Sequence, residues 1–210
     1  MASGQRPRID PRTLLNLYRQ GYFPMADPDT GEVNVYSADP RAIIPLDAVH
    51  ISSKIARLVR RAPFEVRCDT AFVEVMRACA LPRAGSDRTW INEAMVEPYA
   101  ALFEAGYAHS VEAWRGGALV GGLYGVHIGG LFCGESMFHR PDLGGSDASK
   151  ISFVHLVRWL NHRGFGLLDA QMKTPHTARF GCIEVSHREY LGLLARALRL
   201  PVTWGDFRAL

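Results

Sequence analysis

Apolar and polar residues alternate with a period of two through the middle of the chain, from about residue 109 to residue 138. Three such runs follow one another, HSVEAWR, GALVGGLYGV and GLFCGESMF, and the pairs Gly116-Gly117 and Gly129-Gly130 separate them. Alternation of this kind is typical of half-buried strands, and paired glycines mark tight turns. The pattern predicts a three-stranded antiparallel meander.

Helical periodicity precedes this meander. We expect helices over residues 11–20, from Ser52 to about Arg61, through FVEVMRACA with Asp69 as its cap, and over residues 92–104. A short polar residue at the first position of such a run, such as Asp10, can accept a hydrogen bond from a free backbone N–H group. Because Pro98 has no N–H group, it should kink or split the helix that contains it.

Beyond the meander the expected order is helix, strand, helical turn and helix. The run ASKISFVHLVRWLNHR predicts a helix that ends at Gly164, and GLLDAQ predicts the next strand. HTARF predicts a short helical turn. Ser186 and Glu189 form a capping box that opens a last helix through Arg199.

The segment from residue 22 to residue 45 contains four prolines among aromatic residues, which favours an ordered irregular segment, and FEVRC further on predicts a strand. This order indicates an α+β fold. We expect a small, loop-rich N-terminal domain with a basic helix over residues 1–65, and a catalytic domain over residues 66–210. Its mixed, largely antiparallel sheet with packed helices is similar to the acyltransferase fold of the N-acetyltransferase (GNAT) type.

The composition is that of an ordinary globular protein. Of the 210 residues 48% are hydrophobic and 21% charged, and no apolar run approaches the roughly 18 residues of a transmembrane helix. The polar N-terminus, MASGQRPRID, contains no apolar leader-like run. We therefore expect a cytoplasmic protein that has no membrane partner. The formal net charge of +3 is too small to indicate a nucleic-acid partner by itself.

The sequence does not indicate a metal or cofactor site. The four cysteines are scattered without a CxxC pair, and the histidines lack metal-ligand spacing. The GxSxG motif, the phosphate-binding loop and the GxGxxG fingerprint are all absent. We expect reduced thiols, no metal and no cofactor.

Glu135 is a single acidic residue among apolar neighbours in the third strand of the meander. Burying a carboxylate there is costly unless it meets a cation or several donors, so it is either a functional acid or a paired structural residue. Phe132 and Glu135 have opposite parity along the strand. Both can line one pocket only if a bulge intervenes, and Gly134 could supply it.

Asp169 and Gln171 are two residues apart in GLLDAQ, which places both on one face of a strand. They stand at the end of that strand, after an apolar helix and strand, where ligand crevices usually open. The pair is therefore a candidate site, and ordinary strand-end polarity is the alternative.

A basic face is expected on the helix that begins at Ser52. Four cations have a spacing that gathers them on one side: Lys54, Arg57, Arg60 and Arg61. Four like charges on one face repel one another unless an anion binds, so a phosphate backbone is the functional interpretation. A solvated surface is the alternative.

The chain as a whole resembles the leucyl/phenylalanyl-tRNA-protein transferase family over about residues 12 to 195. The motifs that carry the resemblance are YRQGYFPM, DPRAIIPL, TWI at Thr89, HSVEAW, LVGGLYGV, LFCGESMF, the later ASK, LLDAQ and ARFG. The resemblance implies a bacterial cytoplasmic enzyme whose partners are aminoacyl-tRNA and acceptor proteins. It would add Leu or Phe, and less well Met, to proteins beginning with Arg or Lys, which marks them for degradation.

The resemblance also implies roles for individual residues. Asp169 and Gln171 would be the catalytic pair, and Glu135 the acid of the aminoacyl pocket. The wall that receives the Leu or Phe side chain would consist of Leu123, Phe132, Leu156 and Leu168. Trp90 would lie beside the terminal adenosine, and the basic face of residues 54–61 would contact tRNA. Met25 stands where the best-known members have Trp, and the ASK loop is enlarged by PDLGG.

An aminoacyl ester is already activated, so positioning should dominate the chemistry. The initial hypothesis is that the Gln171 side-chain oxygen accepts a hydrogen bond from the attacking amine while Asp169 polarises that amide. We expect a monomer. Two other functions compete: a coenzyme A-dependent N-acyltransferase, and a tRNA- or peptide-binding module without activity. The GGSD segment ahead of the long helix is a poor phosphate loop, because its aspartate would repel phosphate.

Overall fold

The computed structural model describes residues 9–82 and 89–210. The N-terminal residues 1–8, on which the expectation of no leader partly rests, lie outside this range. The helices are α1 (Pro11–Arg19), α2 (Ser53–Arg61), α3 (Phe72–Ala80), α4 (Glu93–Glu104), η1 (Pro141–Leu143, a 3-10 turn), α5 (Ala148–Arg163), α6 (Pro175–Ala178) and α7 (His187–Ala197). The strands are β1 (Phe23–Ala26), β2 (Val33–Tyr36), β3 (Arg41–Ile44), β4 (Glu65–Cys68), β5 (Ala108–Arg115), β6 (Ala118–Ile128), β7 (Leu131–His139), β8 (Leu167–Gln171) and β9 (Ile183–Val185).

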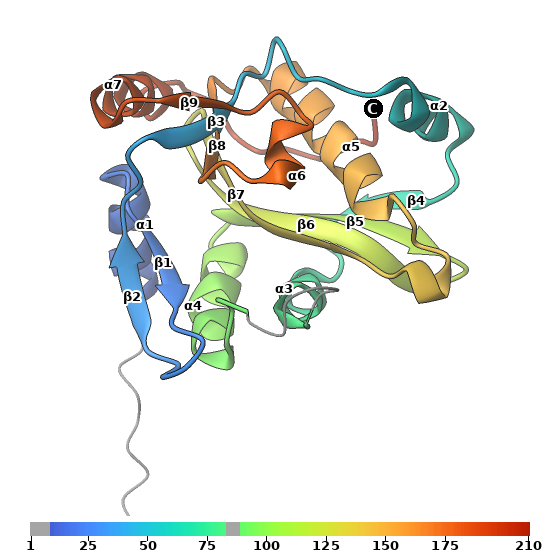
Figure 1. Ribbon diagram of the computed structural model, residues 1–210, viewed down its shortest axis with the longest axis horizontal. Helices are drawn as coiled ribbons and strands as arrows, with labels where there is room; N and C mark the ends of the chain where they lie inside the picture. Colours follow the sequence, from blue (N-terminus) through green and yellow to red (C-terminus); the bar gives the residue numbers. More distant parts are fainter. Residues whose placement is uncertain (1–8, 83–88) are drawn as a thin grey trace, which may run out of the picture.

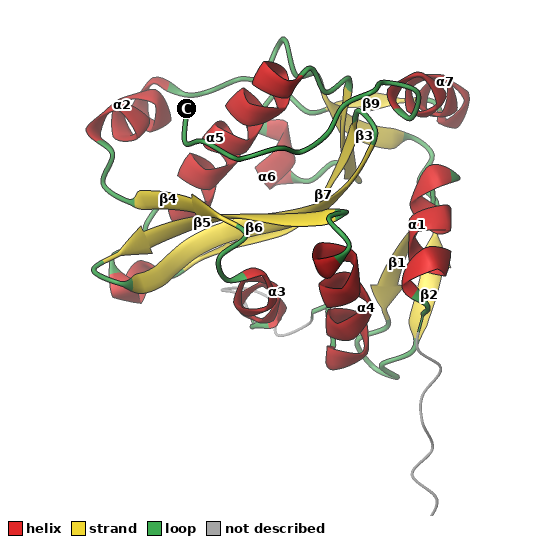
Figure 2. Cartoon of the chain, turned by 180° about the vertical axis from the view of Figure 1, so that it is seen from behind, coloured by secondary structure: helices red, strands yellow, loops and turns green. Residues whose placement is uncertain are grey.

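One seven-stranded sheet organises the molecule, in the order β4-β5-β6-β7-β8-β3-β9. All its pairings are antiparallel except β7 with β8. Helix α5 lies on one face of the sheet, and α3 and α4 lie on the other, as Figure 1 and, from behind, Figure 2 show. A separate hairpin of β1 and β2 stands beside α1 and α4. The α+β class with a mostly antiparallel sheet is confirmed.

The main sheet takes one strand from the N-terminal part of the chain. Strand β3 lies in the segment expected to be irregular, yet it is inserted between β8 and β9. The parts of the chain that we separated at residue 65 therefore share one sheet, and the expectation of an irregular segment through residue 45 was wrong. The prolines were a misleading signal because strand β1 itself contains Pro24 and the hairpin turn contains Pro28, while Pro40, joined to Asp39 by a cis peptide, stands just ahead of β3.

Most of the predicted elements are confirmed. The meander is β5, β6 and β7, and α5 ends at Gly164, which adopts the left-handed conformation. Asp10 caps α1, and Ser186 and Glu189 form the expected capping box of α7.

Two local expectations were wrong. Of the expected kink or split at Pro98, the split is absent: α4 is continuous from Glu93 to Glu104, because the missing N–H group costs one hydrogen bond while the buried side chains around Pro98 keep the helix packed. Asp69 does not cap α3. Instead Glu112 of β5 accepts hydrogen bonds from the backbone N–H groups of Thr70 and Ala71 at the start of that helix.

The interior has two large apolar clusters, one on each face of the sheet. The first includes residues of α1, α3 and α4, and the second includes residues of α5. A smaller third cluster lies beneath α2. Strands β7 and β8 separate these environments at the point where the candidate polar residues lie.

Candidate active site

Strands β7 and β8 form a fork at the centre of the sheet. They pair only over three residues, Leu131 to Cys133 with Leu167 to Asp169, although β7 runs on to His139 against β6. A Cβ atom placed on Gly134, at the start of the fork, would have the Asp169 carbonyl oxygen at 3.8 Å as its only close described neighbour. The glycine therefore leaves space where the strands part.

The bulge that the sequence suggested near Gly134 is present. Tyr124 faces Ser136 and Gly125 faces Gly134, so Glu135 is the extra residue on β7. A bulge redirects the side chain that it contains. Glu135 contacts the Tyr99 hydroxyl, in the first cluster, whereas Phe132 belongs to the second.

The Asp169 carboxylate is buried, with no exposed surface, and is fully occupied by donors. Arg41 donates from Nε to Oδ1 at 2.9 Å and from a terminal nitrogen to Oδ2 at 2.6 Å. The Tyr190 hydroxyl donates to Oδ2 at 2.8 Å, and the Gln171 backbone N–H donates to Oδ1 at 2.9 Å. Charge-assisted, bidentate bonds of this kind are strong and directional. Asp169 therefore anchors the backbone of Gln171.

Gln171 has a backbone conformation that residues other than glycine rarely adopt. Its φ of +55° lies in the left-handed region, and the pairing of β3 with β8 shifts at this point. Such strain is retained where surrounding bonds hold it, here the bond to Asp169. The side-chain Nε2 then donates to Glu135 Oε1 at 3.3 Å. The simple two-residue spacing on one strand face did not anticipate this turn.

Glu135 receives hydrogen bonds from two sides, from Gln171 and from the Tyr99 hydroxyl at 3.3 Å. The Tyr99 hydroxyl also contacts that of Tyr18 on α1. Burial raises the pKa of Glu135 to about 8. The negative charge of Asp169 adds to this rise, whereas the hydrogen bonds from the hydroxyls of Tyr18 and Tyr99 oppose it. A carboxyl with this pKa can exchange a proton near neutral pH.

These contacts alter the initial hypothesis about the amide. The partner of the Gln171 amide is Glu135, whereas Asp169 binds the backbone of Gln171. Four residues that the sequence analysis did not select complete the network: Tyr18, Arg41, Tyr99 and Tyr190. One feature of the sequence could have identified Arg41 as a buried, paired cation: it stands alone beside the apolar run AIIPL.

The four apolar residues expected to receive the aminoacyl side chain lie in one cluster. Leu123, Phe132, Leu156 and Leu168 come from β6, β7, α5 and β8 and are all buried in the second cluster. Phe132 and Leu168 face each other across the parallel pair. The structure thus brings these four residues together.

Met25 and Trp90 lie on the other side of the sheet. Both pack against the first cluster, and Ala26, next to Met25, donates its backbone N–H to the Trp90 carbonyl at 2.9 Å. The two residues expected near an adenosine are thus in adjacent segments.

The basic residues of α2 are all exposed. Lys54 differs from the other three because its ammonium contacts the Asp147 carboxylate at 2.5 Å, and Lys150 also binds this carboxylate. Among the described residues, no ion pair involves Arg57, Arg60 or Arg61. Three of the four cations are therefore available to an anion.

Metal and membrane features can be stated for residues 9–82 and 89–210 alone. Within these ranges no group of three or more His, Cys, Asp or Glu side chains is placed to hold a metal ion. None of the helices there combines the length and apolar character that crossing a bilayer requires.

The site is a carboxyl and amide pair in the fork of an α+β sheet, beside an apolar cluster. A family model described as leucyl/phenylalanyl-tRNA protein transferase matches residues 43–195, and the model of that family's N-terminal domain matches residues 8–39. The chain belongs to the leucyl/phenylalanyl-tRNA protein transferase family, a family of aminoacyltransferases.

Two curated relatives illustrate the similarity, and both are named leucyl/phenylalanyl-tRNA–protein transferase. The protein from Akkermansia muciniphila is 50% identical over 192 residues, covering 91% of this chain and 97% of the relative. The protein from Phenylobacterium zucineum is 50% identical over 204 residues, covering 96% and 89%.

Similarity to solved structures is weaker. A ribosomal-protein-alanine N-acetyltransferase from Brucella melitensis is 16% identical with a TM-score of 0.38, covering 55% of this chain and 85% of that one. L-PGS from Bacillus licheniformis is 13% identical with a TM-score of 0.40, covering 80% and 53%.

Proposed function

We propose that this protein transfers Leu or Phe, and less well Met, from aminoacyl-tRNA to the N-terminal amino group of proteins that begin with Arg or Lys. The product carries a new peptide bond and is marked for degradation as an N-degron. The enzyme acts in the cytoplasm as a monomer and needs no cofactor. Membership of the family supports the assignment of aminoacyl transfer. The contact of Gln171 with Glu135 in the fork supports the assignment of the active site to these residues.

The reaction replaces an ester with an amide. The acceptor α-amine, whose reference pKa is about 7.7 to 8.0, attacks the aminoacyl carbonyl, and the terminal ribose oxygen leaves. One proton leaves the amine and one reaches the ribose oxygen. An enzyme for this reaction must hold the amine near the carbonyl and accept its proton.

Glu135 is the proposed proton acceptor, and Gln171 positions the amine. A glutamine amide is too weak a base for the task, whereas a carboxylate with a pKa near 8 matches the amine. When Glu135 accepts the bond from Gln171 Nε2, the amide is polarised and its Oε1 becomes a better acceptor for the amine N–H. Asp169 supports both residues by holding the Gln171 backbone.

This mechanism predicts the pH profile of transfer. The ionised form of Glu135 is active, so kcat/KM should rise with pH through a midpoint near 8. In Tyr99→Phe the carboxylate loses a donor that lowers its pKa, so the midpoint should move to higher pH by roughly one unit, the worth of one charged hydrogen bond. Steady-state kinetics between pH 6 and 10 measures this shift.

The acceptor amine titrates in the same range, but its midpoint is the same for every variant. The matched control is Tyr107→Phe, which removes a hydroxyl from a partly buried tyrosine that packs against the same cluster. A profile of Tyr99→Phe that coincides with wild type would mean that Glu135 does not set the midpoint.

Three free cations of α2 form the proposed tRNA surface: Arg57, Arg60 and Arg61. Each phosphate that an arginine neutralises releases counterions, so removing one such arginine should lower the magnitude of the slope of log K against log salt by roughly 0.7 to 0.9. Arg60→Ala with Arg61→Ala should therefore weaken aminoacyl-tRNA binding and flatten its salt dependence. tRNAs of different sequence should be affected alike, because backbone contacts do not read bases.

The control for this prediction is Arg196→Ala with Arg199→Ala, which removes the same charge from exposed positions on and after α7. Reaction with a short aminoacyl-adenosine should be nearly unchanged in the α2 variant, because that substrate has no acceptor stem. An unchanged salt slope in the α2 variant would place the tRNA on another surface.

The preference for acceptors beginning with Arg or Lys is supported by the register of the sheet. Ala42 faces Gln171 on one side and Glu184 on the other, so Glu184 lies two strands, roughly 10 Å, from Gln171. Its carboxylate is 43% exposed and contacts Lys173 at 3.6 Å. Exposed ion pairs are weak, so an incoming basic side chain can displace Lys173.

A coenzyme A-dependent N-acyltransferase remains the competing function, and α5 bears on it. A pyrophosphate would need free backbone donors at the start of α5, but Asp147 stands there and its carboxylate binds Lys54 and Lys150. Incubation with an Arg-initiated peptide and either charged tRNA or acetyl-coenzyme A separates the two functions. Transfer from the charged tRNA alone supports the proposal, and acetylation alone contradicts it.

A further inference from the structure

The proposed aminoacyl pocket has a wall that leaves little room for a side chain. Leu123 is 4% exposed, Leu156 1% and Leu168 2%, and Phe132 has no exposed surface. Close-packed interiors do not deform continuously to admit a phenyl or isobutyl group. One wall residue must therefore have space to move into, and the contacts of Phe132 identify where that space lies.

Phe132 packs against Trp204, which belongs to the C-terminal tail, residues 201–210. The two rings are 5.6 Å apart with an interplanar angle of 24°. Trp204 is 6% exposed and is the only buried residue of the tail. It belongs to the same cluster as the four wall residues. Trp204 therefore supports the pocket wall by packing against Phe132.

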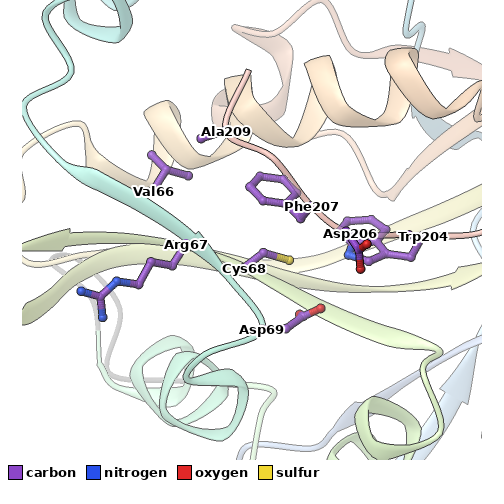
Figure 3. Close-up of a pocket in the computed structure, with 9 residues that line it drawn as sticks. Val66, Arg67, Cys68, Asp69, Trp204, Asp206, Phe207 and Ala209 are labelled. Atoms are coloured by element: carbon purple, nitrogen blue, oxygen red, sulfur yellow. The ribbon is translucent and has the colours of Figure 1, made fainter.

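A pocket of about 390 Å³, partly open to solvent, is lined by Trp204. Figure 3 shows it between β4 and the tail, with Cys68 directed towards the segment that carries Trp204 and Phe207, and with Arg67 pointing away. Its lining is Val66, Arg67, Cys68, Asp69, Trp204, Gly205, Asp206, Phe207 and Ala209. Because Trp204 lines this pocket, a shift of its ring into the pocket displaces solvent and no side chain from the far side of the sheet.

A chain of polar contacts defines the resting position of the ring. The His109 ring stacks on Trp204 with centroids 4.1 Å apart and an angle of 5°. The Asp69 carboxylate contacts His109 Nδ1 at 2.7 Å, and His109 Nε2 lies 3.0 Å from His127 Nδ1. This chain fixes the plane of the imidazole, and hence the surface against which the indole lies.

We infer that Trp204 is a specificity-determining residue: it forms the movable back of the aminoacyl pocket, and its shift into the cavity lets one pocket accept side chains of different size. The inference rests on the proposed function. The smaller Leu side chain needs a small displacement of Phe132 and Trp204, and Phe needs a larger one. Side chains larger than Phe are excluded because the rings of His109 and Phe207, which stack on Trp204, limit how far it can shift.

Substitution of Trp204 tests this inference. In Trp204→Leu the wall behind Phe132 loses its supporting aromatic ring, so kcat/KM for a tryptophanyl substrate relative to a leucyl substrate should rise at least about 10-fold, the usual effect of one or two methylene-sized changes in a pocket. Trp204→Phe should lie between this variant and wild type. Both substrates are aminoacyl-adenosines, so that tRNA identity does not contribute.

The matched control is Trp114→Phe, because Trp114 packs against the first cluster, on the opposite face of the sheet. Its ratio should equal that of wild type. Thermal unfolding checks that each variant is folded. If the Trp204 variants are folded and their ratios stay within twofold of wild type, the inference is wrong.

Binding gives a second readout that needs no turnover. The fluorescence of Trp204, taken as wild type minus Trp204→Phe, should change more on saturation with a non-reactive phenylalanyl-adenosine amide than with the leucyl analogue. Equal changes would contradict movement of the ring. If wild type uses neither Leu nor Phe, the proposed function fails and this inference with it; if wild type transfers both and the Trp204 readouts do not move, only this inference fails.

Discussion

Replacing Gln171 by alanine should lower kcat for aminoacyl transfer by about 10²- to 10³-fold, the usual loss when one pre-positioned polar group is removed from the transition state. The amide touches Glu135 at 3.3 Å in the fork of β7 and β8, and no other side chain is proposed to position the amine. Binding of aminoacyl-tRNA should be nearly unchanged, because the cationic contacts proposed for it lie on α2. Single-turnover transfer and equilibrium tRNA binding measure the two effects separately.

The φ of +55° at Gln171 requires a control for backbone strain. Asparagine tolerates the left-handed conformation and keeps an amide, but its side chain is one methylene shorter. Gln171→Asn should therefore lose nearly as much activity as Gln171→Ala while staying as stable as wild type. Met172→Ala, a change at the exposed next residue, should remain active. Full activity in Gln171→Asn would show that the position of the amide does not matter.

Replacing Arg41 by alanine should have the largest effect on stability, about 3 to 5 kcal/mol of unfolding free energy, because it leaves the Asp169 carboxylate buried without its cation. The guanidinium also donates to the Gly21 carbonyl at 2.8 Å and lies over the rings of Phe23 and Tyr190. Denaturant unfolding measures the loss. Transfer should fall as well, since the Gln171 backbone depends on Asp169.

The chain contains a matched pair of similar chemistry at the surface. Arg67 binds Glu65 through two hydrogen bonds and lies over the Trp114 ring, as Arg41 does with Asp169 and Tyr190. Its side chain is 37% exposed, so solvent replaces the missing bonds and Arg67→Ala should have little effect. Equal losses in Arg41→Ala and Arg67→Ala would contradict the role given to the buried pair.

Asp169→Asn, which keeps the shape of the side chain, should lower turnover strongly and leave tRNA binding nearly intact.

Local signals predicted the elements that local contacts determine. The run from Ala148 to Arg163 has a helical period and a terminal glycine, and the three strands of the meander have alternating residues and paired glycines at their turns. The candidate residues Glu135 and Gln171 could also be predicted from local sequence. A lone carboxylate in an apolar strand and a polar pair at a strand end are visible without tertiary information.

Long-range contacts explain what the sequence did not reveal. Arg41 and Asp169 are 128 positions apart, and β3 joins the sheet through strands that come much later in the chain. Tyr18 and Tyr99 are ordinary helix residues until α1 and α4 bring their hydroxyls to Glu135. Strand parity predicts that the side chains of Asp169 and Gln171 lie on the same face, but the pairing of β3 with β8 is irregular at Gln171. The sequence analysis therefore assigned to Asp169 the contact with the Gln171 amide that Glu135 makes.

The most direct test of the account is transfer of labelled phenylalanine from phenylalanyl-tRNA to a peptide that begins with Arg, followed by mass spectrometry of the peptide. The account predicts a product extended by one phenylalanine at its N-terminus, formed by wild type and reduced at least about 100-fold in Gln171→Ala. A peptide with an acetylated N-terminus should give no product, because it has no attacking amine. Absence of the extended peptide with folded wild-type protein, or its formation at the wild-type rate by Gln171→Ala, would contradict the account.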